Sequence, residues 1–167
     1  HAQVDENIRV IEGTVINGTS GGNLVNGLTV LLHIQTLEDT SITETSVDEY
    51  GQFKFEDVIF DPNAIFGVTV KYQGVVYGRD IDLSSGSPAP FDVAIYESSS
   101  DDGLISIPRA SVIYSQAEQA SQMLWAFEII SIRNSSDRTY VPGAGPMQLL
   151  RFGLPPDAID LSLDTNL

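Results

Sequence analysis

The chain has 167 residues, 42% of them hydrophobic, so it is long enough to bury at least one sizeable core. Its 23 acidic and 8 basic residues give a formal net charge of −15, which opposes binding to nucleic-acid phosphates and to anionic lipid headgroups. The absence of cysteine excludes disulfides, thiolate nucleophiles and cysteine-ligated zinc. The 14 glycines and 8 prolines indicate frequent turns rather than long helices.

The amino terminus bears on location. No stretch approaches the roughly 18 consecutive apolar residues of a membrane-spanning helix. His1-Ala2-Gln3 is similar to the small-x-small end of a bacterial signal peptide. We therefore expect a secreted, cell-surface or periplasmic protein whose signal peptide has already been removed.

The first half of the chain alternates apolar and polar residues in short segments, the pattern of β-strands. A first strand is predicted over 8–18. After a glycine-rich turn, Leu28, Val30, Leu32 and Ile34 define one buried face of a second strand.

The segments that follow predict a β-sandwich. Residues 40–47 are polar and threonine-rich, which favours an edge strand. Asp48-Glu49-Tyr50-Gly51 has turn chemistry, so we expect a tight hairpin into a strand in which Phe53 and Phe55 share a face. Turn signals about every ten residues favour a Greek-key sandwich over a parallel α/β sheet. Further strands are predicted over 66–72, 75–77 and 91–96.

The small, polar segment 98–103, with the sequence SSSDDG, is the natural linker between two units. It divides the chain into a first domain, 1–97, and a second unit, 104–167. The first part holds 15 acidic and 4 basic residues, whereas residues 98–167 hold 8 acidic and 4 basic residues. Most of the negative charge is therefore expected on the first domain.

The second unit repeats the pattern of strands and turns but is short. About five strands are predicted, whereas a free-standing sandwich needs around seven. The predicted fold class is thus all-β, with two immunoglobulin-like antiparallel β-sandwich units. The second is completed either by residues farther along the gene product or by another chain that pairs with an open sheet edge. The five segments are 109–115, 123–134, 139–141, 147–152 and 159–163.

Four segments of the first unit, 11–17, 27–32, 50–55 and 66–70, carry a family resemblance. They resemble the carboxypeptidase regulatory-like domains, a transthyretin-like or CnaB-like branch of the immunoglobulin-like sandwiches. The resemblance covers about the first 97 residues and implies a passive module in a larger protein. The stretch 131–161 is similar to second sandwich units that follow such domains in exported bacterial proteins.

Some CnaB-like domains carry a lysine–asparagine isopeptide crosslink, but this chain departs from that pattern. Its only lysines are Lys54 and Lys71, and the first strand has Arg9 instead. A crosslink is therefore not expected.

The acidic pairs Asp80 with Asp82 and Asp101 with Asp102 are candidate calcium ligands, because calcium prefers carboxylate and carbonyl oxygens. Solvated turns are the alternative for both pairs, as they are for Asp57 with Asp61. The only histidines, His1 and His33, could together ligate copper, although a surface histidine is the simpler interpretation of His33.

Two acceptor sequons for glycosylation, at Asn17 and Asn134, lie in predicted turns. The nucleophile elbow of hydrolases and the phosphate-binding loop with its lysine are missing from the sequence. We therefore expect no enzymatic activity.

The sequence favours a non-enzymatic, exported structural or assembly protein, such as a subunit of a filament, surface array or envelope complex held by β-strand pairing. A carbohydrate-binding or adhesion module, with Trp125 stacking on sugar, is the alternative. The expected partner is a second copy or another envelope protein. The candidate contact residues are Trp125, Phe127, Ile129, Leu161, Leu163 and Leu167.

Overall fold

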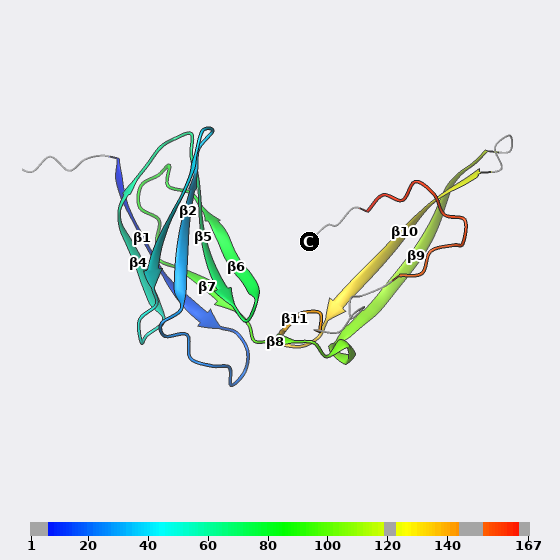
Figure 1. Ribbon diagram of the computed structural model, residues 1–167, viewed down its shortest axis with the longest axis horizontal. Coiled ribbons are helices and arrows are strands. Elements are labelled where there is room, and N and C mark those ends of the chain that lie inside the picture. Colours follow the sequence, from blue (N-terminus) through cyan, green and yellow to red (C-terminus); the bar gives the residue numbers. More distant parts are fainter. Residues whose placement is uncertain (1–6, 119–122, 144–151, 164–167) are drawn as a thin grey trace, which may run out of the picture.

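The computed structural model describes residues 7–118, 123–143 and 152–163 and shows an all-β protein. Figure 1 shows a two-layered sandwich in the first half of the chain and a long two-stranded ribbon in the second half. One layer has the order β4-β1-β7 and the other the order β3-β2-β5-β6. The strands are β1 (Ile8–Asn17), β2 (Thr29–Gln35), β3 (Thr40–Ser46), β4 (Gln52–Ile59), β5 (Ile65–Tyr72), β6 (Val75–Ile81) and β7 (Phe91–Ile95).

The core lies between the two layers and is formed by alternate residues of each strand. In β5, for example, Phe66, Val68 and Val70 are buried while the residues between them are not. The ring of Phe53 packs edge-on against Phe55 and Phe91. The remaining buried apolar residues are Ile11, Val15, Val30, Leu32, Val47, Val58, Tyr72, Ile81, Leu83, Val93 and Ile95.

The predicted strands of the sandwich are confirmed, with β6 extending beyond the predicted 75–77 to Ile81. The prediction of a tight hairpin at residues 48–51 is wrong. A turn does form there: the Asp48 carboxylate accepts hydrogen bonds from the amides of Tyr50 and Gln52, and Gly51 has a φ of 84°. However, β3 pairs with β2 and β4 pairs with β1, so the turn connects the two sheets instead of two paired strands.

The second half of the chain begins with short elements and continues as the ribbon. The predicted linker, 98–103, holds β8 (Ser98–Ser99) and the start of a 3-10 helix, η1 (Asp102–Leu104). The ribbon consists of β9 (Ile105–Glu118) and β10 (Met123–Asn134), so the strands predicted over 109–115 and 123–134 are confirmed, the first of them longer than predicted. The strand β11 (Thr139–Tyr140) pairs in parallel with β8.

The last two predicted strands have different outcomes. The strand predicted over 159–163 is wrong, because the structure has no strand there. Among the described residues, no strand lies beside this segment to pair with it. Most of the strand predicted over 147–152 lies outside the described residues. In the part of the chain that is described, no helix is long and apolar enough to cross a membrane.

Candidate functional site

The ribbon is a two-stranded antiparallel sheet whose side chains are mostly exposed. In the part of the chain that the structure describes, β10 pairs only with β9, and Figure 1 shows the ribbon extending away from the sandwich. Two-stranded hairpins have too little core to be more than marginally stable in water. A ribbon with strands of 14 and 12 residues therefore has far more surface than its own pairing can bury.

Both faces of the ribbon are apolar. On one face, which we call face A, Trp125, Phe127 and Ile129 alternate along β10 and are 50%, 62% and 51% exposed. Ile113 lies directly opposite Phe127 on the same face. The other face exposes further large apolar residues, namely Val112, Tyr114, Leu124 and Ile132. A contiguous apolar surface of this kind usually marks an interaction site.

The two outer edges of the ribbon differ in their ability to pair with another strand. β9 contains Pro108, and its register with β10 shifts twice because β9 has an extra residue near Ser115 and another near Pro108. Proline and bulges both protect a sheet edge from further pairing. β10 has neither proline nor an extra residue, so its outer edge is the one suited to accept a strand.

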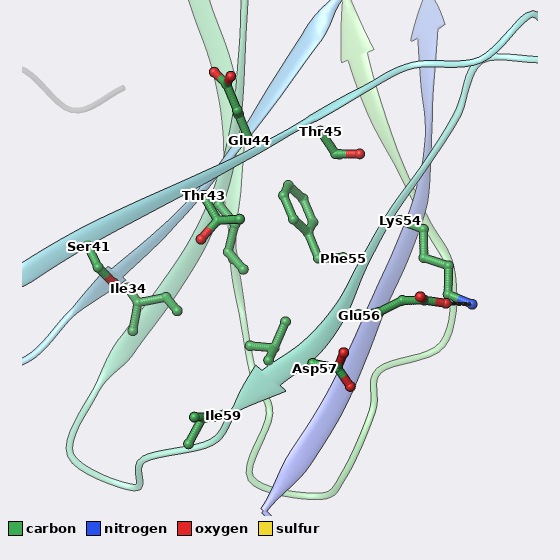
Figure 2. Close-up of a pocket in the computed structure, with 12 residues that line it drawn as sticks. Ile34, Ser41, Thr43, Glu44, Thr45, Lys54, Phe55, Glu56, Asp57 and Ile59 are labelled. Carbon is green, nitrogen blue, oxygen red and sulfur yellow. Dashed lines mark ion pairs between the residues drawn. The ribbon is translucent and has the colours of Figure 1, made fainter.

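The sandwich has an open groove between its two layers. Since β3 and β4 end different sheets, their unpaired edges border the same opening, with a volume of about 500 Å³ (Figure 2). Leu32, Phe55 and Val58 form its apolar lining. Its charged lining residues are Glu44, Lys54, Glu56 and Asp57, three acidic and one basic, so the groove is net negative. The groove therefore combines an apolar interior, two strand edges and an acidic rim.

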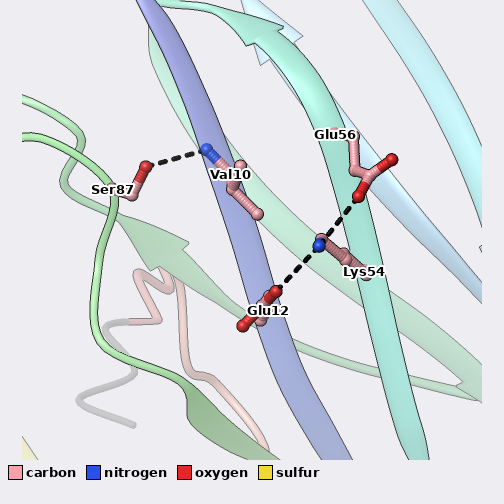
Figure 3. Close-up of polar contacts among 5 residues, drawn as sticks. All are labelled: Val10, Glu12, Lys54, Glu56 and Ser87. Atoms are coloured by element: carbon pink, nitrogen blue, oxygen red, sulfur yellow. Dashed lines mark hydrogen bonds and ion pairs between the residues drawn. The ribbon is translucent and has the colours of Figure 1, made fainter.

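An ion-pair cluster lies beside this groove on the outer side of β4. The Lys54 Nζ atom is 2.8 Å from Glu56 Oε1 and 3.2 Å from Glu12 Oε1 (Figure 3). Hydrogen bonding to Lys54 holds the pKa of Glu56 below its usual value, and bonding to Glu56 and Glu12 raises the pKa of Lys54. The Lys54–Glu12 pair bridges β4 and β1, whereas Lys54–Glu56 lies within β4, and exposed pairs of this kind contribute little stability. In the same view, Ser87 Oγ accepts a hydrogen bond from the Val10 amide at 2.8 Å.

The junction between sandwich and ribbon is organised by a buried carboxylate, Glu97, which is 7% exposed. Its Oε1 atom accepts hydrogen bonds from the Tyr72 hydroxyl at 2.7 Å, the Asn23 amide at 2.8 Å, and the side chains of Asn23 and Asn17, each at 3.0 Å. Oε2 accepts a further bond from Gln73. Donation by the Asn23 amide and by Tyr72 lowers the pKa of Glu97 to about 2.

The same junction attaches the base of the ribbon to the sandwich. Thr19 accepts a hydrogen bond from the Glu97 amide at 2.9 Å and donates to the Asp137 carbonyl at 2.7 Å. The Thr139 amide donates to the Glu97 carbonyl at 2.9 Å, and the Thr139 hydroxyl lies 2.7 Å from the hydroxyl of Tyr77. The glycine-rich turn thus serves as a contact for the segment that follows the ribbon, a role that sequence reasoning missed.

The predicted calcium ligands lie apart in two separate pairs. Asp82 caps a turn by accepting a hydrogen bond from the Ser84 amide, and Asp101 caps η1 by accepting from the Gly103 amide. Hydrogen bonding by the side chain and then the amide of Ser84 lowers the pKa of Asp82. Asp80 lies on β6 and Asp102 in η1. Among the described residues, no three histidine, aspartate or glutamate side chains come together in a way that could hold a metal ion.

The other predicted site residues are also placed by the structure. His33 Nε2 lies 2.7 Å from the Thr69 hydroxyl, and His1 lies outside the described residues. The sequon nitrogens are both engaged: Asn17 Nδ2 donates to the Asn23 carbonyl and to Glu97, and Asn134 Nδ2 donates to the Arg138 carbonyl.

The predicted contact residues fall into two groups. Trp125, Phe127 and Ile129 share face A, so the structure brings these three together. Leu161 and Leu163 are exposed in a segment without regular structure, and Leu167 lies outside the described residues.

Comparison with known proteins gives a distant structural similarity. No family model and no curated protein matches the chain. Among solved structures, the crystal structure of S.CueP is similar at 10% sequence identity and a TM-score of 0.38. The match covers 53% of this chain and 63% of that one.

Proposed function

We propose that this chain is a non-enzymatic structural or assembly protein that associates with another chain through its ribbon. The observation that carries the proposal is the ribbon itself, which exposes large apolar side chains on both faces and has an unprotected edge along β10. Strand pairing at that edge and packing on face A would bury this surface. The sandwich serves as the rigid body that presents the ribbon.

The resemblance of the first domain to carboxypeptidase regulatory-like modules supports this role. Such modules serve as passive scaffolds, and the open, acidic groove between β3 and β4 is not enclosed as a catalytic cleft is. A filament, a surface array or an envelope complex would all use the same ribbon contact.

Light scattering during size-exclusion chromatography tests the proposal. We expect the native protein to exceed its 18.1 kDa monomer mass as its concentration rises. The double variant Phe127→Ser/Ile129→Ser should stay folded and weaken association about tenfold or more, because both side chains lie on face A. Leu24→Ser, at a residue 91% exposed on a sandwich loop, is the matched control. A native protein that remains monomeric at every concentration would contradict the proposal.

Carbohydrate binding is a second candidate, favoured by one observation. Trp125 and Phe127 are exposed on the same face of the ribbon, where their rings could stack on sugar. A glycan array decides between the two: binding that is lost in Trp125→Ala supports adhesion to carbohydrate, and an array without signal removes this candidate.

A further inference from the structure

Two strand edges border the groove of the sandwich, and only one of them is suited to accept a strand. In β4, Glu56 and Asp57 together oppose the single β1 residue Val10, and Asp57 has a φ of 57°. Such a bulge disrupts the hydrogen-bonding edge. β3, in contrast, pairs with β2 through seven consecutive residues without a shift, and it contains no proline or lysine. β3 is therefore an unprotected edge.

The residues of β3 that face the groove leave room for an incoming strand. Ser41, Thr43 and Thr45 pair with the inward-facing residues of β2, so their short hydroxyl side chains point into the opening (Figure 2). A strand added to β3 would extend this sheet, and alternate side chains would enter the groove above Phe55 and Val58. The position requires a strand with one apolar face.

The unprotected edge of β10 has the properties that this position requires. Its 12 residues exceed the seven of β3, and face A supplies Trp125, Phe127 and Ile129 at alternate positions. The charges are complementary as well. The groove is lined by Glu44, Glu56 and Asp57 together with Lys54 and is net negative, whereas residues 105–134 have two acidic and two basic residues and no net charge. Both of these basic residues, Arg109 and Arg133, lie on face A.

We propose that β10 of one copy pairs with β3 of a second copy and inserts face A into the groove between β3 and β4. This inference rests on the proposed function and names its partner surface. Because donor and acceptor are different surfaces of one chain, each added copy leaves a free β10 at one end and a free β3 at the other. Contacts of this kind build open filaments or closed rings.

Cysteine crosslinking of the full chain tests the pairing, since the protein has no native cysteine. Thr43→Cys lies on β3 and Ile129→Cys on β10, and both positions are exposed. Oxidation of the two variants mixed together should give a disulfide-linked dimer that neither variant gives alone. Val76→Cys, on the opposite edge strand β6 of the same sheet, is the matched control and should not crosslink with Ile129→Cys.

The outcomes separate the pairing from the proposed function. A dimer of Ile129→Cys alone would show β10 pairing with β10, which overturns the groove site and retains assembly through the ribbon. Oligomers seen by light scattering without any crosslink between Thr43→Cys and Ile129→Cys would likewise overturn the groove site alone. A chain that is monomeric throughout would overturn both.

Discussion

At the scale of single residues, Glu97 decides how the sandwich and the ribbon are joined. Its carboxylate accepts hydrogen bonds from donors on the end of β1, the glycine-rich turn and the β5–β6 turn, and its backbone contacts Thr19 and Thr139. A buried carboxylate is tolerated only when its oxygens are satisfied in this way. The residue is therefore structural, and it holds the attachment of the ribbon.

Replacing Glu97 with glutamine should destabilise the protein. The new amide group would present hydrogens to donors that need an acceptor, so at least one partly buried hydrogen bond would be lost. We expect a clearly lower midpoint of thermal unfolding, together with faster hydrogen exchange at the amide of Thr139. Glu49→Gln, in an exposed turn, is the control and should leave the midpoint unchanged. Equal midpoints for the two variants would contradict the role given to Glu97.

The lowered pKa of Glu97 makes stability depend on pH. The carboxyl has a pKa of about 2 in the folded protein and an ordinary value of 4.5. The folded state therefore binds this proton less readily than the unfolded state does, and stability is lost as pH falls from 4.5 toward 2. Chemical denaturation across this range should show a smaller loss in Glu97→Gln than in the wild type. A loss of the same size in both proteins would assign the acid sensitivity to other carboxylates.

Gly13 offers a second test at this scale. A Cβ atom there would lie 2.6 Å from the carbonyl oxygen of Phe91 and 2.5 Å from the ring of Phe53. Gly13→Ala should therefore destabilise the sandwich by about 1–3 kcal/mol. Gly153→Ala, where nothing lies within 4 Å of the added atom, should be neutral. Urea denaturation of the two variants provides the comparison, and a stable Gly13→Ala protein would show that β1 and β7 can separate without cost.

At the scale of elements, local pattern predicted most strands but not all of their partners. Alternation in β2, β4 and β5 gave the correct buried faces, because a strand with one buried face repeats every two residues. The turn at residues 48–51 was recognised, yet β4 pairs with β1, 38 to 51 positions earlier, instead of with β3. Such long-range pairing is set by packing of the whole sandwich and leaves no local signal.

The groove and the Glu97 cluster were beyond sequence reasoning for the same reason. The groove exists because β3 and β4 separate into different sheets. The partners of Glu97 lie as far as 80 positions away, at Asn17. In contrast, face A was predicted from sequence, because Trp125, Phe127 and Ile129 alternate within one strand.

At the scale of the whole molecule, core and contact surface occupy different parts of the chain. Among the described residues, every buried apolar side chain lies between Ile11 and Ile95, and most of the large apolar residues of the ribbon are exposed. The sandwich thus has the interior of a complete domain, and the ribbon has the composition of an interface.

This division predicts the behaviour of a truncated chain. A protein ending at residue 103 keeps the entire core and loses the contacts made by Asp137 and Thr139. We expect it to unfold cooperatively at a somewhat lower temperature than the full chain and to remain monomeric. Calorimetry and light scattering provide the measurements. Association of the truncated chain as strong as that of the full chain would place the contact on the sandwich alone.

The most direct measurement of assembly through β10 is hydrogen–deuterium exchange of the native protein at low and at high concentration. Among residues 7–118, 123–143 and 152–163, no strand pairs with the outer edge of β10, so we expect its amides to exchange rapidly unless another chain covers them. We expect the amides of residues 123–134 to become protected as concentration rises, while those of the sandwich core stay unchanged. Exchange in 123–134 that remains equally fast at every concentration would contradict assembly through the ribbon.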